Sequence, residues 1–405
     1  MKILFLTNLL PYPLDNGGKI KTYTTLKALH ENGHEIDLIS FYEDEEDVKY
    51  IGKMQELCQN VKVIKLKLTT ATNKAYMLKQ AIKSLFSKYS FGVYKYYSKM
   101  MTETLNHIGR EQKYDCVYFD HLQMCVYYEC LKKIYPKAKY ILDEHNCEYV
   151  IMQRRYLASK NILMKAFMLL EVAKLKSFEK KMLLIFDEII ALTHEDRNAM
   201  KSLVVRDIPI NVIPIGMENN TDNLYGKNKS DDLTRIMFVG TLSWGPNSDG
   251  IIWFIRNVFP KMAKIIGTFE LYIIGKNPSN ELKNIASLYP NIIVTGYVDS
   301  VIPYYEKCDY MIVPLFVGSG QRVKIIEGFS YGMPVISTTI GAEGIEYIDG
   351  HNILIADDVD EFLIACMKMI DEKFRNKLSV ESKKVYNEKY SIKAVSKKIN
   401  DVLNL

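Results

Sequence analysis

Three observations predict that this 405-residue chain folds as two Rossmann-like α/β domains, each with a doubly wound parallel sheet, that face a central cleft. Short apolar runs of strand length alternate with segments of helical periodicity, which is typical of parallel sheets covered by helices. The alternation stops at a polar, turn-rich stretch, 219–232, and then begins again. The chain is also long enough for two cores of common domain size.

The first half opens with a βαβ unit. Lys2–Asn8 is a continuous apolar run, expected to form a strand buried on both faces. A loop with Gly17 and Gly18 leads to a helix over Lys19–Asn32, and Glu35–Phe41 is the next strand. The remaining elements expected in this half are strands at Val61–Leu66, Cys116–Phe119, Tyr140–Asp143 and Glu188–Leu192, and a helix at Asn161–Phe186.

The second half repeats the pattern. Arg235–Val239 is expected to be a strand, and a glycine-bearing loop after Gly240 leads to a helix around Trp253. The further elements are strands at Leu271–Ile274, Ile292–Thr295, Tyr310–Pro314 and Pro334–Ser337, and a final helix near Ser391–Leu403. We therefore expect domains at 1–215 and 233–384, a linker at 216–232, and a C-terminal helix within 385–405 that packs back on the first domain.

Composition narrows the function classes. The net charge of +5 forms no dense basic stripe, which disfavours nucleic acid as a partner. The seven cysteines show no CxxC or zinc-like spacing, which is typical of reduced thiols in a cytoplasmic protein. The short apolar start is interpreted as a strand and not as a signal peptide, and no window is long enough for a membrane span. The chain is thus expected to be cytoplasmic, either soluble or peripheral at the inner face of the cell membrane.

The most informative segment is 313–345, where a buried strand is followed by a glycine loop and a helix. Gly318 and Gly320 allow close backbone approach, and the helix expected from about Gln321 to Tyr331 offers free N–H groups, a natural phosphate seat. Arg322 and Lys324 add cations there, and Glu327 could accept hydrogen bonds from a ribose diol. The same sequence is also compatible with an ordinary glycine turn that has exposed basic residues and a solvated Glu.

With these residues in view, the chain resembles the family-4 retaining glycosyltransferases of GT-B fold over nearly all of its length. The N-terminal LPYPLDNGGKIKTYTTLKALHENGHEI resembles the family's glycine-loop opening. The segments IIALTHEDR and VIPIGM resemble the stretch before the linker, and FVGTLSWGPNSDGI resembles the first loop of the donor domain. YVDSVIPYYEKCDYMIVP resembles the base-contacting turn and its following strand. The order in which these segments occur is more specific for the family than any single segment.

The resemblance implies a nucleotide-sugar site in the C-terminal domain. Glu327 matches the last Glu of the family's E-x7-E motif, which binds ribose, whereas the first Glu falls on Ser319. The family's diphosphate-binding Arg and Lys fall on Leu242 and Asp249, so that role is expected to move to Arg322 and Lys324. The other donor contacts implied by the resemblance are Gly17, Gly18, Gly240, Thr241, Tyr297, Val298, Gly318, Ser319, Gly320 and Glu343, with Gly341 and Ala342 nearby.

In the N-terminal half, the resemblance singles out His145, which follows a strand where the family keeps a pocket histidine. Asp143 or Glu148 is expected to orient it, and Lys19 and Lys21 are expected to add positive charge beside the glycine loop. His121, at another strand end, is interpreted as a surface or satisfied residue. His145 is assigned to positioning and polarising the substrate, since the leaving phosphate is expected to take the acceptor's proton.

The function expected from the resemblance is transfer of a hexosyl-type sugar, with retention, from a UDP- or GDP-sugar to a cell-surface glycan or polyprenyl-linked precursor. Neither a metal nor another cofactor is expected, because the helix end, Arg322 and Lys324 would stabilise the leaving diphosphate. Two other readings stay open: a catalytically idle nucleotide-sugar-binding subunit of a glycan assembly complex, and a non-hydrolysing sugar-nucleotide epimerase. Phe86–Met101 and Asn161–Phe186, rich in Lys and apolar residues, could lie on an anionic bilayer or be ordinary packed helices.

Overall fold

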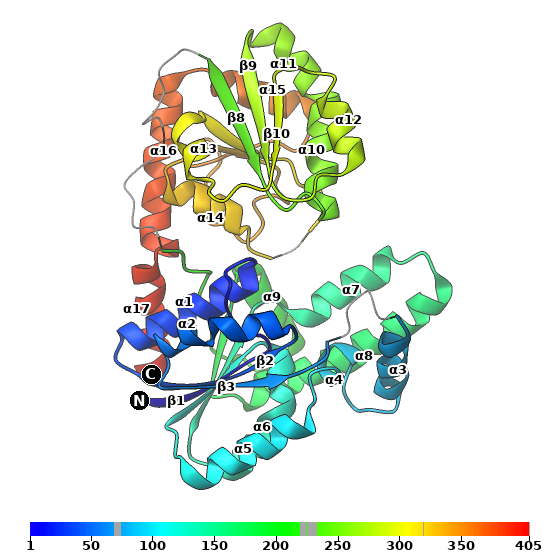
Figure 1. The fold of residues 1–405 in the computed structure, drawn as a ribbon, viewed down its shortest axis with the longest axis vertical. Coiled ribbons are helices and arrows are strands. Elements are labelled where there is room, and N and C mark those ends of the chain that lie inside the picture. The colour runs from blue at the N-terminus through cyan, green and yellow to red at the C-terminus, as the bar shows by residue number, and fades with distance from the viewer. Residues whose placement is uncertain (69–73, 219–224, 226–232, 319, 405) are drawn as a thin grey trace. The chain divides into compact units, whose positions relative to one another are not determined.

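The structure, a computed structural model, describes residues 1–68, 74–218, 225, 233–318 and 320–404 (Figure 1). The chain forms two compact units. Unit 1 contains Met1–Gly216 together with Val395–Leu405, and unit 2 contains Met217–Ala394. The last residues of the chain therefore return to unit 1, where Val395 packs beside Gly216.

Unit 1 is built on a seven-stranded parallel sheet in the order β3-β2-β1-β4-β5-β6-β7. Its strands are β1 Lys2–Thr7, β2 Glu35–Tyr42, β3 Asn60–Lys65, β4 Cys116–Asp120, β5 Lys139–Glu144, β6 Glu188–Ala191 and β7 Ile210–Val212. Its longer helices are α1 Gly17–Glu31, α3 Lys74–Leu85, α5 Lys99–Glu111, α7 Glu148–Ala158, α8 Ile162–Ile185, α9 His194–Leu203 and α17 Ile392–Asn404. The short ones are η1 Glu45–Tyr50, α2 Ile51–Gln55, α4 Phe91–Tyr94, η2 Leu122–Tyr127 and α6 Tyr128–Ile134. Two apolar cores cover the faces of this sheet.

Unit 2 is built on a six-stranded parallel sheet in the order β10-β9-β8-β11-β12-β13. Its strands are β8 Thr234–Val239, β9 Phe269–Ile274, β10 Ile292–Gly296, β11 Tyr310–Val313, β12 Val335–Ser337 and β13 Leu354–Ile355. Its helices are α10 Gly245–Asn257, α11 Phe259–Ile265, α12 Asn280–Ala286, α13 Ile302–Lys307, α14 Val323–Ser330, α15 Val359–Lys368, α16 Glu372–Val385 and η3 Tyr386–Tyr390.

Strand order places a ligand-binding position in each sheet. In unit 1 the order turns back between β1 and β4, and in unit 2 between β8 and β11. Ligands of open α/β sheets bind beyond the carboxyl ends of the strands at such a switch point. The residues that follow β1, β4, β8 and β11 are therefore where each site should be sought.

The predicted fold class, two Rossmann-like parallel-sheet domains, is confirmed. Two short strands, β7 and β13, were not predicted, since three-residue and two-residue runs carry no clear period. The helix expected from Gln321 begins later, at Val323, with Arg322 as its N-cap in a non-helical conformation. Most of the predicted linker lies outside the described residues.

Candidate active site

In unit 2, a lysine, an asparagine and a glycine meet after strand β8. Lys324 of α14 donates a hydrogen bond from Nζ to Asn247 Oδ1 on α10, at 2.8 Å. Asn247 Nδ2 in turn donates to the carbonyl of Thr241, at 3.0 Å. A Cβ on Gly240 would lie 2.8 Å from Lys324 Nζ and 2.7 Å from Asn247 Nδ2, closer than real contacts allow. The lysine amino group thus reaches the glycine turn only because Gly240 has no side chain.

The surroundings shift the pKa values of Lys324 and Glu327, two ionisable residues of α14. Burial lowers the pKa of Lys324 to about 7, and the positive charge of Arg322 acts in the same direction. Burial raises the pKa of Glu327 to about 7, against the Tyr305 hydroxyl and the Lys324 charge. Perturbed groups at a switch point are typical of functional sites. Glu327 is also only partly exposed, so the interpretation of it as a solvated surface residue is wrong.

Arg322 is buried beneath the glycine loop and is not an exposed cation. A Cβ on Gly318, whose φ is +142°, would lie 2.6 Å from its Nη2 atom, and Nη2 donates to the carbonyl of Ile340 at 3.3 Å. Burial lowers the pKa of Arg322, while the nearby carboxylate of Glu343 opposes this shift. Gly320 also has a positive φ, +81°. The two glycines are needed for backbone shape and for the close approach of the guanidinium.

The other residues that the resemblance implies for the nucleotide-sugar site differ in their exposure to solvent. Tyr297 is 72% exposed after β10, and Val298 is partly buried. Leu242, where the family has a basic residue, is a core side chain, and Asp249 is exposed. Ser319 lies outside the described residues. Neither Leu242 nor Asp249 supplies a basic group here, so the transfer of the diphosphate role to Arg322 and Lys324 stays a prediction.

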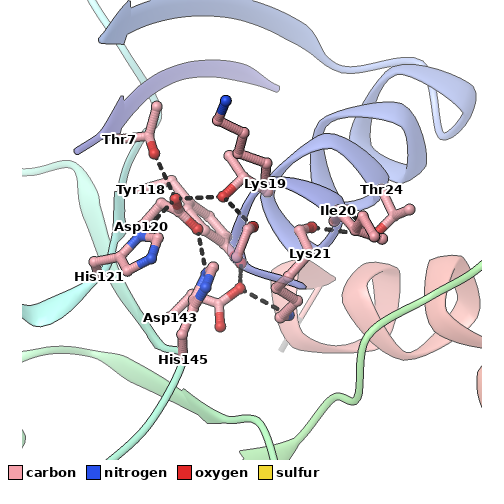
Figure 2. A network of polar contacts seen from close by, with 12 residues as sticks. Thr7, Lys19, Ile20, Lys21, Thr24, Tyr118, Asp120, His121, Asp143 and His145 are labelled. Carbon is pink, nitrogen blue, oxygen red and sulfur yellow. Dashed lines mark hydrogen bonds and ion pairs between the residues drawn. The ribbon is translucent and has the colours of Figure 1, made fainter. Parts of the chain in front are cut away.

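In unit 1, four side chains donate hydrogen bonds to the buried carboxylate of Asp120, at the end of β4 (Figure 2). Its Oδ1 atom accepts from His145 Nε2 at 2.8 Å. Its Oδ2 atom accepts from the hydroxyls of Thr7 and Thr22, at 2.6 and 2.8 Å, and from His121 Nδ1 at 2.9 Å. The orienting partner of His145 is therefore Asp120, and the prediction of Asp143 or Glu148 is wrong.

His121 belongs to this site, contrary to its interpretation as a surface residue. Its ring lies 3.6 Å, centroid to centroid, from that of His145. Its backbone has a φ of 80°, a region that costs a non-glycine residue on the order of 1–3 kcal/mol. This conformation lets two consecutive residues, Asp120 and His121, contact each other and His145.

The hydrogen bonds determine what each imidazole offers. Burial acts to raise the pKa of Asp120, but the charges of the two histidines outweigh it and hold that pKa well below its usual value. Burial lowers the pKa of His145, and the charge of His121 adds to the effect. Burial acts to lower the pKa of His121 as well, but Asp120 outweighs it and the net shift is upward. A neutral His145 thus keeps an acceptor at Nδ1, while a protonated His121 presents a donor at Nε2.

Both free ring atoms lie beside the predicted glycine loop. A Cβ on Gly18 would be 3.9 Å from His121 Nε2 and 3.9 Å from His145 Nδ1. Gly17 begins helix α1, whose N-cap Asn16 accepts from the backbone N–H of Lys19 at 3.0 Å. The loop and the imidazole pair thus form one polar site at the end of the sheet.

Lys21 does not add positive charge to this loop, and that prediction is wrong. Its side chain is fully buried, and Nζ lies 3.0 Å from Asp143 Oδ2, which also accepts from the Tyr118 hydroxyl at 2.6 Å. Figure 2 shows the contact of Lys21 with Asp143 beside the histidine cluster. Lys19, which is partly buried, pairs with Asp15 at 3.3 Å. Lys21 and Asp143 therefore hold α1 against β5, and they are not ligand-binding charges.

Asp120, His121 and His145 also bring three potential metal ligands within 4.8 Å of one another. Both Asp120 oxygens already accept hydrogen bonds, so the carboxylate is satisfied by the protein alone. With His121 protonated, its Nε2 can only donate, so the two imidazoles together suit a substrate hydroxyl better than a cation.

Comparisons with known proteins agree with this reading of the fold. Residues 234–372 match the family model described as Glycosyl transferases group 1. A 44.6 kDa protein in the cps region of Klebsiella pneumoniae is 26% identical over 367 residues, which cover 88% of each chain. Sucrose-phosphate synthase from Thermosynechococcus elongatus has a TM-score of 0.69 at 15% identity, covering 100% of this chain and 98% of its own. Anabaena HepE in complex with UDP-glucose has a TM-score of 0.63 at 12% identity, covering 100% and 99%.

Proposed function

We propose that this chain, a group 1 glycosyltransferase of GT-B fold by its family match and architecture, transfers a hexosyl-type sugar with retention from a UDP- or GDP-sugar. The acceptor is a cell-surface glycan precursor, and we favour a polyprenyl-linked one. The relative from a cps region and the neighbour crystallised with UDP-glucose support this choice of substrates.

The observation that carries the proposal is the basic position after β8. Lys324 Nζ lies against the bare backbone of Gly240, with Arg322 at the start of the same helix and Glu327 one turn further on. A diphosphate seated at Gly240 would meet the Lys324 amino group and the first N–H groups of α14. Glu327 would accept hydrogen bonds from the ribose hydroxyls.

These groups act when the sugar–phosphate bond breaks. Negative charge grows on the leaving diphosphate, and the buried cations are already in position to stabilise it, so little reorganisation is needed. A bound diphosphate would itself favour the charged form of Lys324, whose pKa is lowered to about 7. The proposal needs no metal, because Arg322, Lys324 and the helix supply the positive charge. Retention follows if the leaving phosphate takes the acceptor's proton on the face from which it departs.

The histidine pair in unit 1 is proposed to bind substrate hydroxyls. A neutral His145 with Nδ1 as acceptor and a protonated His121 with Nε2 as donor would fix the orientation of one hydroxyl or of two adjacent ones. His145 is thus a positioning and polarising residue in this proposal, and His121 shares the role.

The function is tested in two steps. A thermal-shift screen of UDP-, GDP-, ADP- and dTDP-sugars should show stabilisation by one class of donor, since a ligand that binds the folded state raises its melting temperature. That donor is then incubated with polyprenyl-diphosphate-linked sugars, and the anomeric configuration of the product is read by NMR. An axial-to-axial outcome supports retention. Stabilisation by no nucleotide would overturn the donor site, and conversion of the donor without any acceptor would favour the epimerase reading.

A further inference from the structure

Unit 1 exposes a group of large apolar side chains on α3 and around the turn between α7 and α8, here called the α3–α8 surface. Phe86, directly after α3, is 90% exposed, and Ile162 and Leu163, at the start of α8, are 82% and 84% exposed. The other exposed members are Met77, Leu78, Ile82, Leu85, Leu157, Met164, Leu169 and Leu170. Monomeric soluble proteins rarely leave so many large apolar groups together in water.

The two helices are held together as one surface. Lys174 of α8 donates hydrogen bonds from Nζ to the carbonyls of Ser84, Leu85 and Ser87, at 2.7, 3.1 and 2.8 Å. Its amino group therefore caps the C-terminal end of α3. Glu171, one turn earlier on α8, accepts from the backbone N–H of Phe91 at 2.5 Å. Figure 1 shows α3 beside α8, with the α7–α8 turn extending from the same side of unit 1.

The two sequence segments that carry most of this surface contain no acidic residue. Between Glu56 and Glu103 there is no acidic residue and there are nine lysines. Between Glu148 and Glu171 there is again none, with two arginines and two lysines. The positive charge of these two segments exceeds the net charge of +5 on the whole chain, so the rest of the chain has a net negative charge. Lys79, Lys83, Lys88 and Lys160 are exposed beside the apolar side chains.

We propose that the α3–α8 surface binds an anionic lipid bilayer, with its apolar side chains in the acyl boundary and its lysines among the headgroups. Protein interfaces are depleted in lysine, whereas lysine beside apolar residues suits the membrane interface, where its stem lies on lipid and its amino group reaches phosphate. No helix of the described residues is long and apolar enough to cross a membrane, so the contact proposed is peripheral.

The surface differs from the segments that the sequence suggested. Within Phe86–Met101, Val93, Tyr96 and Met101 are buried, and the second half of α8 packs its apolar face into the core. The exposed apolar groups lie instead on α3 and on the first half of α8. This inference does not depend on the proposed glycosyl transfer, because it concerns binding to lipid alone.

The test is sedimentation of the full-length protein with vesicles of phosphatidylcholine alone and of an equimolar mixture with phosphatidylglycerol. We expect binding to the mixed vesicles that weakens in 1 M salt, where the Debye length falls to about 3 Å. Leu78→Ser with Phe86→Ser should lower the partition coefficient by about tenfold or more, since each exposed side chain would no longer bury apolar area in lipid. Lys79→Glu with Lys83→Glu should lower it by at least about 25-fold, at roughly fivefold per lost charge.

Two controls match these variants. Val205→Ser removes an exposed apolar residue elsewhere in unit 1, and Lys113→Glu with Lys137→Glu makes the same charge change away from the surface. Both should bind vesicles like the parent, and all variants should keep its melting temperature. Equal binding to both vesicle types, or equal binding by all variants, would overturn the proposal. A stable dimer that Leu78→Ser with Phe86→Ser converts to monomer would show instead that a second copy covers the surface.

Discussion

His145 Nε2 lies 2.8 Å from Asp120 Oδ1, and this one contact fixes which nitrogen of the histidine is free to meet a substrate. Because an ionised carboxylate can only accept, Nε2 carries the hydrogen and Nδ1 keeps the lone pair. The same carboxylate accepts from His121 Nδ1. One buried charge therefore orients two imidazoles.

Asp120→Asn should lower kcat/KM by roughly 10- to 100-fold, the cost that is typical when the outer partner of a metal-bound histidine is removed. The pKa of His121, raised by the Asp120 charge despite burial, should fall in the variant. His121 would then lose the proton on Nε2 at a lower pH than in the parent, so the alkaline limb of the pH–rate profile should move to lower pH. An unchanged profile with reduced stability alone would show that Asp120 is merely structural.

Donor affinity should depend on pH through Lys324, whose pKa is lowered by burial to about 7. As the pH rises from 6 to 8.5, Lys324 of the ligand-free protein loses its proton and with it the positive charge that attracts the diphosphate. The apparent Kd of the donor should therefore increase. Titration calorimetry with an intact nucleoside diphosphate sugar checks this, because its phosphates carry no proton that titrates in this range. Lys324→Met should bind the donor weakly at every pH. Glu327→Gln should still show an apparent Kd that increases with pH above pH 7.

The same lowered pKa has a consequence for stability. Between about pH 7 and 10.5 the unfolded chain holds a proton on Lys324 that the folded chain lacks, so this group makes the folded state more stable as pH rises. Lys324→Met removes the burial cost of the amine and should raise the melting temperature of the ligand-free protein at pH 7. A lower melting temperature would mean that its hydrogen bond to Asn247 outweighs that cost.

Gly240→Ala should abolish donor binding and leave unit 2 folded. The new methyl group would lie 2.7 Å from Asn247 Nδ2 and 2.8 Å from Lys324 Nζ, and must displace both side-chain ends from the glycine turn. Gly245→Ala is the matched control, since its nearest contact would be an ordinary 3.9 Å to Asp249 Oδ2. Donor binding by the two variants is compared by calorimetry. Similar affinities would place the diphosphate away from Gly240.

Lys21→Met should lower the free energy of unfolding of unit 1 by about 3–5 kcal/mol, because it leaves Asp143 charged and buried without its partner. Lys53→Met, which removes an exposed pair with Glu56, should cost far less, because surface ion pairs contribute little to stability. Urea unfolding followed by tyrosine fluorescence and circular dichroism distinguishes the two. Equal losses would contradict a structural role for the Lys21–Asp143 pair.

Much of the fold could be predicted because buried parallel strands have plain apolar runs. Lys2–Asn8 and Arg235–Val239 correspond to β1 and β8 within a residue or two. The short strands β7 and β13 could not be predicted, because they are held by sheet neighbours and not by their own period. The start of α14 differs because Arg322 turns its side chain under Gly318 before the helix begins.

The candidate site could be predicted only in part. Resemblance located Lys324 and Glu327, but their partners Asn247 and Tyr305 lie far away in sequence. In unit 1, Asp120 ends a buried strand, and a polar residue at that position was a signal that could have been used. Nothing in the sequence showed that His121 would take a positive φ and lie against His145, since this follows from packing.

We propose that a nucleotide sugar binds in unit 2 at Lys324 and Glu327. The most direct measurement is calorimetric titration of the donor found by the thermal-shift screen into the parent protein, Lys324→Met, and Lys283→Met as a control in α12. We expect one site per chain in the parent and the control, and at least tenfold weaker binding by Lys324→Met, about 1.4 kcal/mol. Equal affinity in all three proteins would contradict it.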